Sequence, residues 1–400
     1  MQRLSSSWRD RPLDVTRRIA ERLAPTLGIT RITEITWLDR IGIPVFASIR
    51  PGAAEGSLCV NAGKGSTRDE ARIGALMEAV EFAMAEPEQH RRVIFVASPM
   101  EIVQQASLAV EFVDFCPLWQ VVIDPTARID AIYATDIANL NAVAIPAELV
   151  FSPYQAMGRQ VLFGHSTNGL CSGNNINEAL LHGLCEVLER DVLSFNNVQD
   201  KSVWVEQSEL PVCISELLDK ITRAGMRVAL RYTKNVFGLP FFQGYIFSAN
   251  DDVIAISVGS GLHPSRKIAA VRAITEAAQS RLSYIHGGRD DLTERKEFFA
   301  IRGPEVERRE LRTMRERALA KRPAITFADI EEASCASVED GLNLLRARLQ
   351  LVGIQQVLYV DLSPNAELAV LKVIVPQLES FSRHSMRVGK RLVRYIEDVA

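Results

Sequence analysis

The sequence repeats one supersecondary pattern three times, and this repeat limits the possible folds more than any other feature. In each copy a strand-like run leads into a glycine-rich loop and then into an alanine-rich helix with acidic residues. The copies occupy residues 57–86, 161–195 and 253–287. Repeated units indicate how a site is assembled, because equivalent elements carry equivalent side chains. We therefore expect an α/β (α+β) protein with β-sheets packed against helices, in which three acid-bearing helices converge on one cleft.

The first helix, expected over residues 68–86, carries a narrow acidic stripe. At about 100° per residue, Glu70, Glu78 and Glu81 fall with Gly74 and Ala85 on a stripe roughly 80° wide. Most of the remaining positions are apolar, which is typical of a buried helix. Carboxylates on a buried helix must be paired or bound to a cation. The stripe therefore predicts a ligand site, and the two small residues keep it open.

The second helix follows a loop that is rich in glycine and uncharged polar residues, residues 167–174. Asn175 is the expected N-cap. Four polar side chains of the helix fall within an arc of about 80°: Glu178, His182, Glu186 and Glu189. Alone, this helix is ordinary amphipathic sequence. The loop favours a functional interpretation, because its glycines allow a close backbone approach and its Thr and Asn side chains donate hydrogen bonds without charge.

The third helix is expected over residues 265–285. One stripe of it carries Arg272, Glu276 and Gln279. Arg281 projects from the opposite side, so we expect it to pack or pair structurally. Arg272 and Glu276 are four residues apart, and on their own they fit a simple ion pair within the helix.

Five glutamates of the three stripes could share one cleft: Glu78, Glu81, Glu186, Glu189 and Glu276. Like charges at such close range cannot all stay ionised without cations. Carboxylate oxygens suit Mg²⁺, which binds through a few of them together with substrate phosphates. Lys64, Ser66 and Arg272, with the glycine-rich loops, would complete a cradle for a polyphosphate. The residues therefore predict a Mg²⁺–ATP site.

This nucleotide site is of neither familiar type. A Walker A loop is excluded because Leu58 stands where its first glycine belongs and Gly65 separates Lys64 from Ser66. A dinucleotide fingerprint is excluded because Pro264 replaces its third glycine. The histidines have no metal-ligand spacing and no His-Glu-x-x-His motif is present, which argues against a zinc enzyme.

Composition excludes several other classes. The 400 residues include 46 Lys+Arg and 49 Asp+Glu, a net charge of −3, so we expect no nucleic acid and no anionic membrane as partner. The sequence has no secretory signal, and no apolar run reaches the roughly 18–20 residues of a membrane span. The six cysteines are far apart, which favours reduced thiols and a cytoplasmic protein.

Periodicity and turn residues place further elements outside the repeat. We expect a helix over residues 13–28, two strands within 29–48, strands over 227–232, 240–247, 253–258 and 369–375, and a C-terminal helix over 385–396. Residues 249–252 are expected to join two of these strands as a hairpin turn. The charge-dense stretch 290–322 is interpreted as a solvated helix and loop, with a docking surface as the alternative.

Three stretches give the chain a family resemblance: residues 63–65 with 78–81, residues 166–174 with 186–191, and residues 272–281. Together they resemble the YcaO family, and the similarity extends over about residues 28 to 380. It implies a YcaO domain over residues 59–400 with the YcaO fold. Residues 1–58 would then form an N-terminal segment, a helix plus strands, that packs on this core.

The resemblance implies ATP-dependent modification of a peptide backbone amide. A nucleophile adds to the amide carbonyl, the oxyanion takes a phosphoryl group from ATP, and phosphate leaves. In related enzymes the acids that match the five glutamates hold Mg²⁺, so these are the predicted catalytic and metal-binding residues. Residues matching Ser66, Asn174, Glu178 and Arg190 contact the nucleotide. Lys64, Arg272 and Gln279 complete the predicted nucleotide-binding set.

The nucleophile differs among members: a Cys, Ser or Thr side chain gives an azoline, sulfide gives a thioamide and an amine gives an amidine. This chain lacks the Pro-x-Pro-x-Pro tail of many azoline-forming relatives and has no leader-binding or E1-like domain upstream. It therefore resembles the stand-alone, TfuA-associated branch, so thioamide formation ranks first and azoline formation second. Cys171 is interpreted as a small packed residue, with a sulfur carrier as the alternative.

The expected partners are a precursor peptide or protein substrate and a TfuA-like protein that supplies sulfide. A homodimer is left open. A third function is a catalytically silent scaffold that binds a precursor peptide for a partner enzyme. Its signature would be the loss of acids from the stripes, and all five are present.

Overall fold

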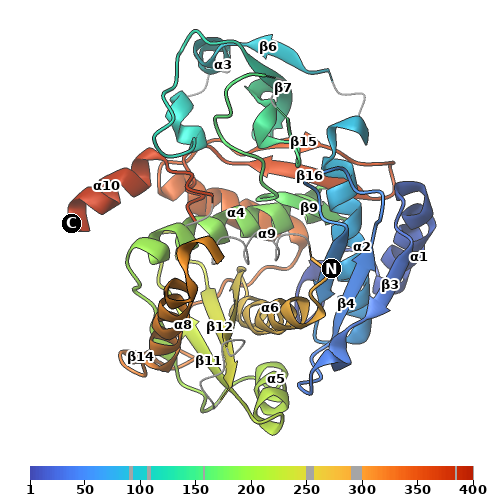
Figure 1. Cartoon of the computed structure of the whole chain (residues 1–400), viewed down its shortest axis with the longest axis vertical. Helices are drawn as coiled ribbons and strands as arrows, with labels where there is room; N and C mark the ends of the chain where they lie inside the picture. The colour runs from blue at the N-terminus through green and yellow to red at the C-terminus, as the bar shows by residue number, and fades with distance from the viewer. Residues whose placement is uncertain are drawn as a thin grey trace. The chain divides into compact units, whose positions relative to one another are not determined.

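The structure is a computed structural model of the whole chain, drawn in Figure 1, and it describes residues 1–89, 93–105, 110–155, 158–248, 256–289, 300–382 and 385–399. The chain divides into two compact units. Unit 1 comprises Met1–Ala53, Leu58–Val80 and Lys201–Cys335, and unit 2 comprises Ala54–Ser57, Glu81–Asp200 and Ala336–Ala400. Helix α2 (Arg68–Ala85) runs from unit 1 into unit 2. The expected boundary between residues 58 and 59 stays a prediction.

Unit 1 is built on two antiparallel sheets and a short ribbon. One sheet has the order β3-β4-β5, with β3 (Arg31–Glu34), β4 (Val45–Ile49) and β5 (Val60–Lys64). The other has the order β13-β12-β11-β10-β14, with β10 (Val203–Val205), β11 (Met226–Tyr232), β12 (Phe241–Ser248), β13 (Ile256–Leu262) and β14 (Ala324–Ile325). Only the β10–β14 pair of this sheet is parallel. The ribbon pairs β1 (Gln2–Arg3) with β2 (Trp8–Arg9).

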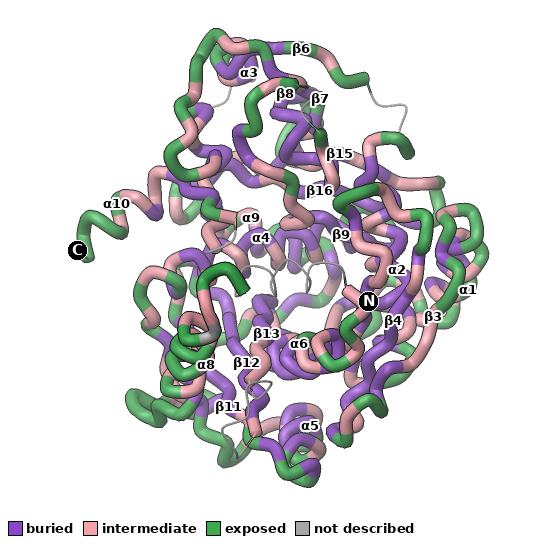
Figure 2. The backbone as a smooth tube through the Cα atoms, in the orientation of Figure 1, coloured by how far each residue is buried: buried purple, intermediate pink, exposed green. Residues whose placement is uncertain are grey.

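The core of unit 1 lies around helix α6 (Arg266–His286), which packs on β12 and β13 and also contacts β5. Helix α5 (Val212–Arg223) packs on β11 and α6 and contributes apolar side chains to this core. Helices α1 (Leu13–Leu23) and α8 (Pro304–Leu319) are also part of unit 1. Figure 2 shows β11 to β13 as largely buried and α8 as largely exposed.

Unit 2 contains a sheet of order β6-β7-β15-β16-β9, with β8 paired to β7. The strands are β6 (Phe95–Ala97), β7 (Ile129–Asp136), β8 (Ala142–Pro146), β9 (Leu170–Gly173), β15 (Leu358–Asp361) and β16 (Ala369–Ile374), all antiparallel to their neighbours. Helix α4 (Ile176–Val198) packs on β9 and β16, and α9 (Val338–Leu351) packs on α4. Helices α3 (Pro99–Gln105) and α10 (Lys390–Val399) complete the unit.

The three-fold repeat is confirmed in the order β5–α2, β9–α4 and β13–α6. Asn175 caps α4 as expected, because its side chain accepts a hydrogen bond from the backbone N–H of Glu178 at 2.9 Å. Most of the other expected strands and helices are found at close to their predicted bounds. The strand expected over residues 253–258 differs: the described part, β13, continues to Leu262 and so includes two glycines of the expected loop, and it is the antiparallel neighbour of β12. The hairpin turn expected at residues 249–252 and part of the charge-dense stretch lie outside the described residues.

Two helix predictions were wrong at one end. The helix expected over residues 13–28 ends at Leu23 and continues as a 3-10 helix, because Pro25 has no backbone N–H to extend an α-helix. The C-terminal helix begins at Lys390 rather than at residue 385. Before it, the guanidinium of Arg387 donates to the carbonyls of Phe115 and Cys116 at 2.7 and 2.8 Å, which holds this stretch in a non-helical path.

Within the described residues, no helix combines the length and the apolar character that a bilayer span requires. All six cysteines are free thiols.

One buried histidine gives the stability of unit 1 a pH dependence. His263 is 5% exposed, stacks edge-on against Trp8, and accepts a hydrogen bond from the N–H of Ser265 at 3.0 Å. Burial lowers the pKa of His263 well below its usual value, and the charges of Arg272 and Arg9 add to this shift.

We predict that the free energy of unfolding falls as the pH drops below about 6.5. At such a pH the imidazole of His263 binds a proton in the unfolded chain but stays neutral in the folded chain. Chemical denaturation should therefore give a lower free energy of unfolding at about pH 5.5 than at about pH 7. The difference should shrink in His263→Gln. An equal difference in the variant and the wild type would contradict this explanation.

Candidate functional site

The loop between β5 and α2 is held by a close contact between backbones. A Cβ atom at Gly63 would overlap backbone atoms of Ala71 and Ala75, so only glycine lets the strand cross the helix here. The loop then turns into α2, where the N–H of Ser66 donates to the carboxylate of Glu70 at 2.9 Å. This places Ser66 at the start of the first acidic stripe.

The stripe of α6 faces β5 within unit 1. The ammonium of Lys64 contacts the carboxylate of Glu276 at 2.8 Å, and the amide of Gln279 donates to the carbonyl of Ala62. The structure therefore brings Glu276 and Gln279 of α6 against β5, which lies more than 200 residues earlier in the chain. Lys64, on the strand that α6 contacts, is therefore one partner of Glu276. The interpretation of Arg281 as structural is confirmed, because Nε pairs with Asp39 at 3.0 Å.

Several buried polar atoms of unit 1 have no hydrogen-bond partner: the hydroxyl of Ser66 after β5, Nε of Arg272 on α6 and both amide atoms of Asn61 on β5. A buried donor without a partner costs roughly 1–3 kcal/mol. The hydroxyl of Ser66, two residues after Lys64, and the N–H of Arg272 are donors of the kind that a polyphosphate accepts from. The residues of unit 1 therefore fit the phosphates of ATP.

Asn61 is a site candidate that sequence reasoning missed. It is fully buried, and on β5 it lies opposite Ser48, whose hydroxyl donates to the carbonyl of Ala75 at 2.7 Å. Directly opposed residues share a face of the sheet, so Asn61 also faces α2. Glu78 lies on the same side of α2 as Gly74, one helical turn further along. Gly74 faces β5, because an added Cβ there would sit 3.5 Å from Cα of Gly63. The only signal in the sequence was an amide within an otherwise apolar run.

In unit 2 the glutamate at the end of the first stripe meets the strand of the second repeat copy. The hydroxyl of Ser172 on β9 donates to the carboxylate of Glu81. Asn174 and Glu178 bind each other, with the amide of Asn174 2.9 and 3.0 Å from the two carboxylate oxygens. Both side chains are almost completely buried. The start of α4 is therefore fixed by the two residues predicted to contact the nucleotide.

Cys171 lies next to this acidic group and is confirmed as a packed residue. It has no exposed surface, and its thiol contacts the carbonyl of Leu371 at 3.5 Å. Burial raises the pKa of the Cys171 thiol well above its usual range, and the charges of Glu81 and Glu186 raise it further. Because the thiolate is the nucleophilic form, this environment argues against a sulfur carrier.

Lys372 is a second candidate that the sequence analysis did not identify. It stands in the middle of β16, is 2% exposed, and donates to the carbonyl of Ser166 in the loop that precedes β9. Burial lowers the pKa of Lys372 to about 7, while the charge of Glu186 opposes that shift. The sequence feature that could have identified it is a single lysine within an otherwise apolar strand.

The last two predicted residues of α4 are neighbours that interact. Glu189 is 2% exposed, and its carboxylate is 3.6 Å from the guanidinium of Arg190. In the part of the chain that the structure describes, no three His, Cys, Asp or Glu side chains form a cluster that could hold a metal ion. The metal-binding role of the five glutamates therefore stays a prediction, although carboxylate oxygens are the ligands that Mg²⁺ prefers.

We predict that Ser66→Ala separates stability from nucleotide binding. Removal of an unpartnered buried hydroxyl should leave the midpoint of thermal unfolding unchanged or raised. A lost hydrogen bond to a charged phosphate should weaken Mg²⁺–ATP binding about 10- to 100-fold, measured by calorimetry. Ser280→Ala, at an exposed serine of α6, is the matched control. Wild-type affinity in Ser66→Ala would exclude the hydroxyl from the site.

Comparison with known proteins places these residues in a family. The family model described as YcaO cyclodehydratase, ATP- and Mg²⁺-binding, matches residues 62–379. This chain belongs to the YcaO family. It is thus a member of a family of ATP-dependent enzymes that modify peptide backbones, and ATP and Mg²⁺ are its cofactors.

Two relatives match over nearly the whole length. An uncharacterised protein of Methanothermobacter thermautotrophicus is 37% identical over 96% of this chain and 97% of its own length. A protein of Rhizobium leguminosarum bv. trifolii, described as lying in the tfuA 3′ region, is 31% identical over 92% of this chain and 88% of its own.

Solved structures share the YcaO fold. YcaO from Methanopyrus kandleri, bound with AMPPCP and Mg²⁺, has a TM-score of 0.75 at 23% identity, over 98% of this chain and 97% of that one. A heterocyclase in complex with substrate and cofactor also has a TM-score of 0.75, at 17% identity, over 98% of this chain and 56% of that one. The mixed α/β YcaO fold expected from the sequence is therefore confirmed.

Proposed function

We propose that this protein phosphorylates the oxygen of a peptide backbone amide and that sulfide is the nucleophile, so that the product is a thioamide in a ribosomally synthesised peptide. The observation that carries the ATP-dependent step is that two buried donors of unit 1, the hydroxyl of Ser66 and Nε of Arg272, have no hydrogen-bond partner, while Lys64 contacts Glu276 on the same helix as Arg272. The choice of sulfide is supported by the relative from the tfuA 3′ region.

In this proposal Mg²⁺–ATP, when bound, supplies the phosphoryl group. Lys64, Ser66 and Arg272 bind phosphate oxygens, and Gln279 keeps α6 against β5 through the carbonyl of Ala62. Asn174, Glu178 and Arg190 bind the nucleotide at the start and the middle of α4. The five glutamates bind Mg²⁺, and the proposal includes one cleft shared by the stripes of the three helices.

The chemistry follows from the leaving group. An amide oxygen leaves poorly, whereas phosphate leaves readily, so transfer of a phosphoryl group to the oxygen makes substitution possible. Sulfide adds to the carbonyl carbon, the oxygen departs with phosphate, and a C=S bond replaces C=O. Positioning and charge stabilisation are the main contributions of a protein to phosphoryl transfer, which agrees with a site of Lys, Arg, Ser and Glu side chains.

The proposed partners are a precursor peptide and a TfuA-like protein that delivers sulfide. Support comes from related structures: one heterocyclase is described with substrate and cofactor, and an E. coli microcin synthetase complex is described with pro-MccB17 bound. Azoline formation is the second candidate, because the family description reads cyclodehydratase and a heterocyclase shares the fold.

We predict that Glu→Gln at position 78, 81, 186, 189 or 276 lowers ATP turnover with a cognate peptide by about 100-fold or more, since each variant removes a ligand charge from Mg²⁺. The fold should survive in each variant, because glutamine keeps the size of the side chain and its carbonyl oxygen can still accept a hydrogen bond. Glu86→Gln is the matched control, since its buried carboxylate accepts from the N–H of Ala54 at 3.0 Å. Wild-type turnover in any two of the five variants would refute the shared site.

We predict that the product peptide gains about 16 Da per modified amide, because sulfur replaces oxygen after the oxygen has left as phosphate. Mass spectrometry of a reaction with peptide, ATP, Mg²⁺ and sulfide measures this change. A loss of about 18 Da on a peptide with Cys, Ser or Thr, without added sulfide, would make azoline formation correct instead.

A further inference from the structure

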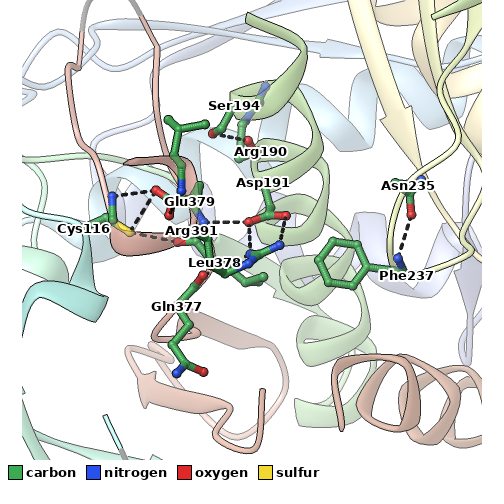
Figure 3. A network of polar contacts seen from close by, with 12 residues as sticks. Cys116, Arg190, Asp191, Ser194, Asn235, Phe237, Gln377, Leu378, Glu379 and Arg391 are labelled. Carbon is green, nitrogen blue, oxygen red and sulfur yellow. Dashed lines mark hydrogen bonds and ion pairs between the residues drawn. The ribbon is translucent and has the colours of Figure 1, made fainter. Parts of the chain in front are cut away.

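A buried ion pair lies directly behind the proposed Mg²⁺–ATP residues of α4. Asp191 is 1% exposed, and its two carboxylate oxygens are 2.6 and 3.3 Å from the guanidinium nitrogens of Arg391 on α10. The N–H of Glu379 donates to the same carboxylate at 2.7 Å (Figure 3). This bidentate geometry fixes both distance and orientation between the two helices.

The arginine is itself held in one orientation. It donates to the carbonyl of Gln377 at 3.1 Å, and its guanidinium lies 5.2 Å from the centre of the Phe195 ring on α4. Glu379 fixes the start of α10, because its carboxylate accepts from the N–H groups of Gly389 and Leu392 at 2.6 and 2.9 Å. The first turn of α10 is therefore rigidly attached to α4.

A second attachment lies one turn further along α4. The hydroxyl of Ser194 donates to the carbonyl of Arg190 at 2.7 Å and accepts from the N–H of Phe381 at 2.8 Å. Figure 3 shows Asp191, Ser194 and Arg190 on one helix with Glu379 and Arg391 beside them. Glu379, Phe381 and Arg391 thus bind α4 at two successive turns.

Asp191, which Arg391 binds, is next to Arg190 and two residues from Glu189, the residues that the proposed function uses. At about 100° per residue, Glu189 lies on the side of α4 that is nearly opposite Asp191. A contact that fixes Asp191 therefore fixes the rotation of the helix and, with it, the direction of Glu189. Arg190 has its backbone carbonyl held within the same network.

We propose that the Asp191–Arg391 pair is a positioning clamp, through which α10 holds Glu189 and Arg190 in place for Mg²⁺–ATP. This inference rests on the proposed function, because it takes its meaning from the roles of those two residues. A displacement of about 1 Å at a catalytic group can cost on the order of 100-fold. Asp191 and Arg391 act through α4, so both are positioning residues.

The test compares Arg391→Met and Arg391→Lys with Arg394→Met, an exposed arginine of the same helix. Lysine keeps the charge but loses the bidentate fork. Calorimetry with AMPPCP and Mg²⁺ measures the nucleotide dissociation constant, and thermal unfolding measures stability. We expect an increase in the dissociation constant of about 10- to 100-fold in Arg391→Met, a smaller increase in Arg391→Lys, and no change in Arg394→Met.

Wild-type affinity in a folded Arg391→Met would overturn the clamp. If that variant does not fold, Arg391→Lys decides, and wild-type affinity there has the same meaning. Glu189→Gln separates this outcome from a failure of the proposed function. If Glu189→Gln loses Mg²⁺–AMPPCP binding while Arg391→Met and Arg391→Lys keep wild-type affinity, the clamp is refuted and the proposed function is not. An unmodified protein that does not bind Mg²⁺–AMPPCP refutes the proposed function.

Discussion

In each repeat copy, a glycine of the strand lies against the backbone of the helix that follows it. A Cβ atom at Gly63 or Gly259 would overlap backbone atoms of α2 or α6, and one at Gly173 would sit 2.5 Å from the nitrogen of Ala179 in α4. An added Cβ at Gly259 would also meet Cβ of Glu276 at 2.5 Å. These contacts set how close each acidic stripe lies to the end of its strand, so the position of the carboxylates depends on them.

Close packing brings charged and polar groups into regions with little water. These groups differ in whether they have a hydrogen-bond partner. Carboxylates receive partners: Lys64 for Glu276, Asn174 for Glu178 and Ser172 for Glu81. Ser66 and Arg272 instead retain buried atoms without a hydrogen-bond partner. An unpaired buried donor lowers stability, so each one in a native structure requires an explanation, such as an ordered water or a bound ligand. This contrast supports the assignment of the donors to a phosphate ligand.

Sequence reasoning predicted what depends on local periodicity. The repeat, the bounds of α2 and α6, and the start of α4 at its cap Asn175 follow from spacing and side-chain type alone. It could not predict pairings between distant segments, such as Lys64 with Glu276 or Arg391 with Asp191, which are 212 and 200 residues apart. No local pattern encodes these contacts, because they depend on which strand lies beside which helix. The predicted start of the C-terminal helix at residue 385 was wrong for the same reason. Arg387 holds the stretch before α10 in a non-helical path through a hydrogen bond to Cys116, which lies 271 residues earlier.

The central claim is that the amide oxygen leaves as part of phosphate. A cognate peptide labelled with ¹⁸O at the modified amide tests this most directly, with the released phosphate analysed by mass spectrometry. The account predicts one ¹⁸O atom in the inorganic phosphate for each amide that is converted, since the bond that breaks joins carbon to that oxygen. Unlabelled phosphate released alongside a modified peptide would contradict O-phosphorylation of the amide and, with it, the proposed function.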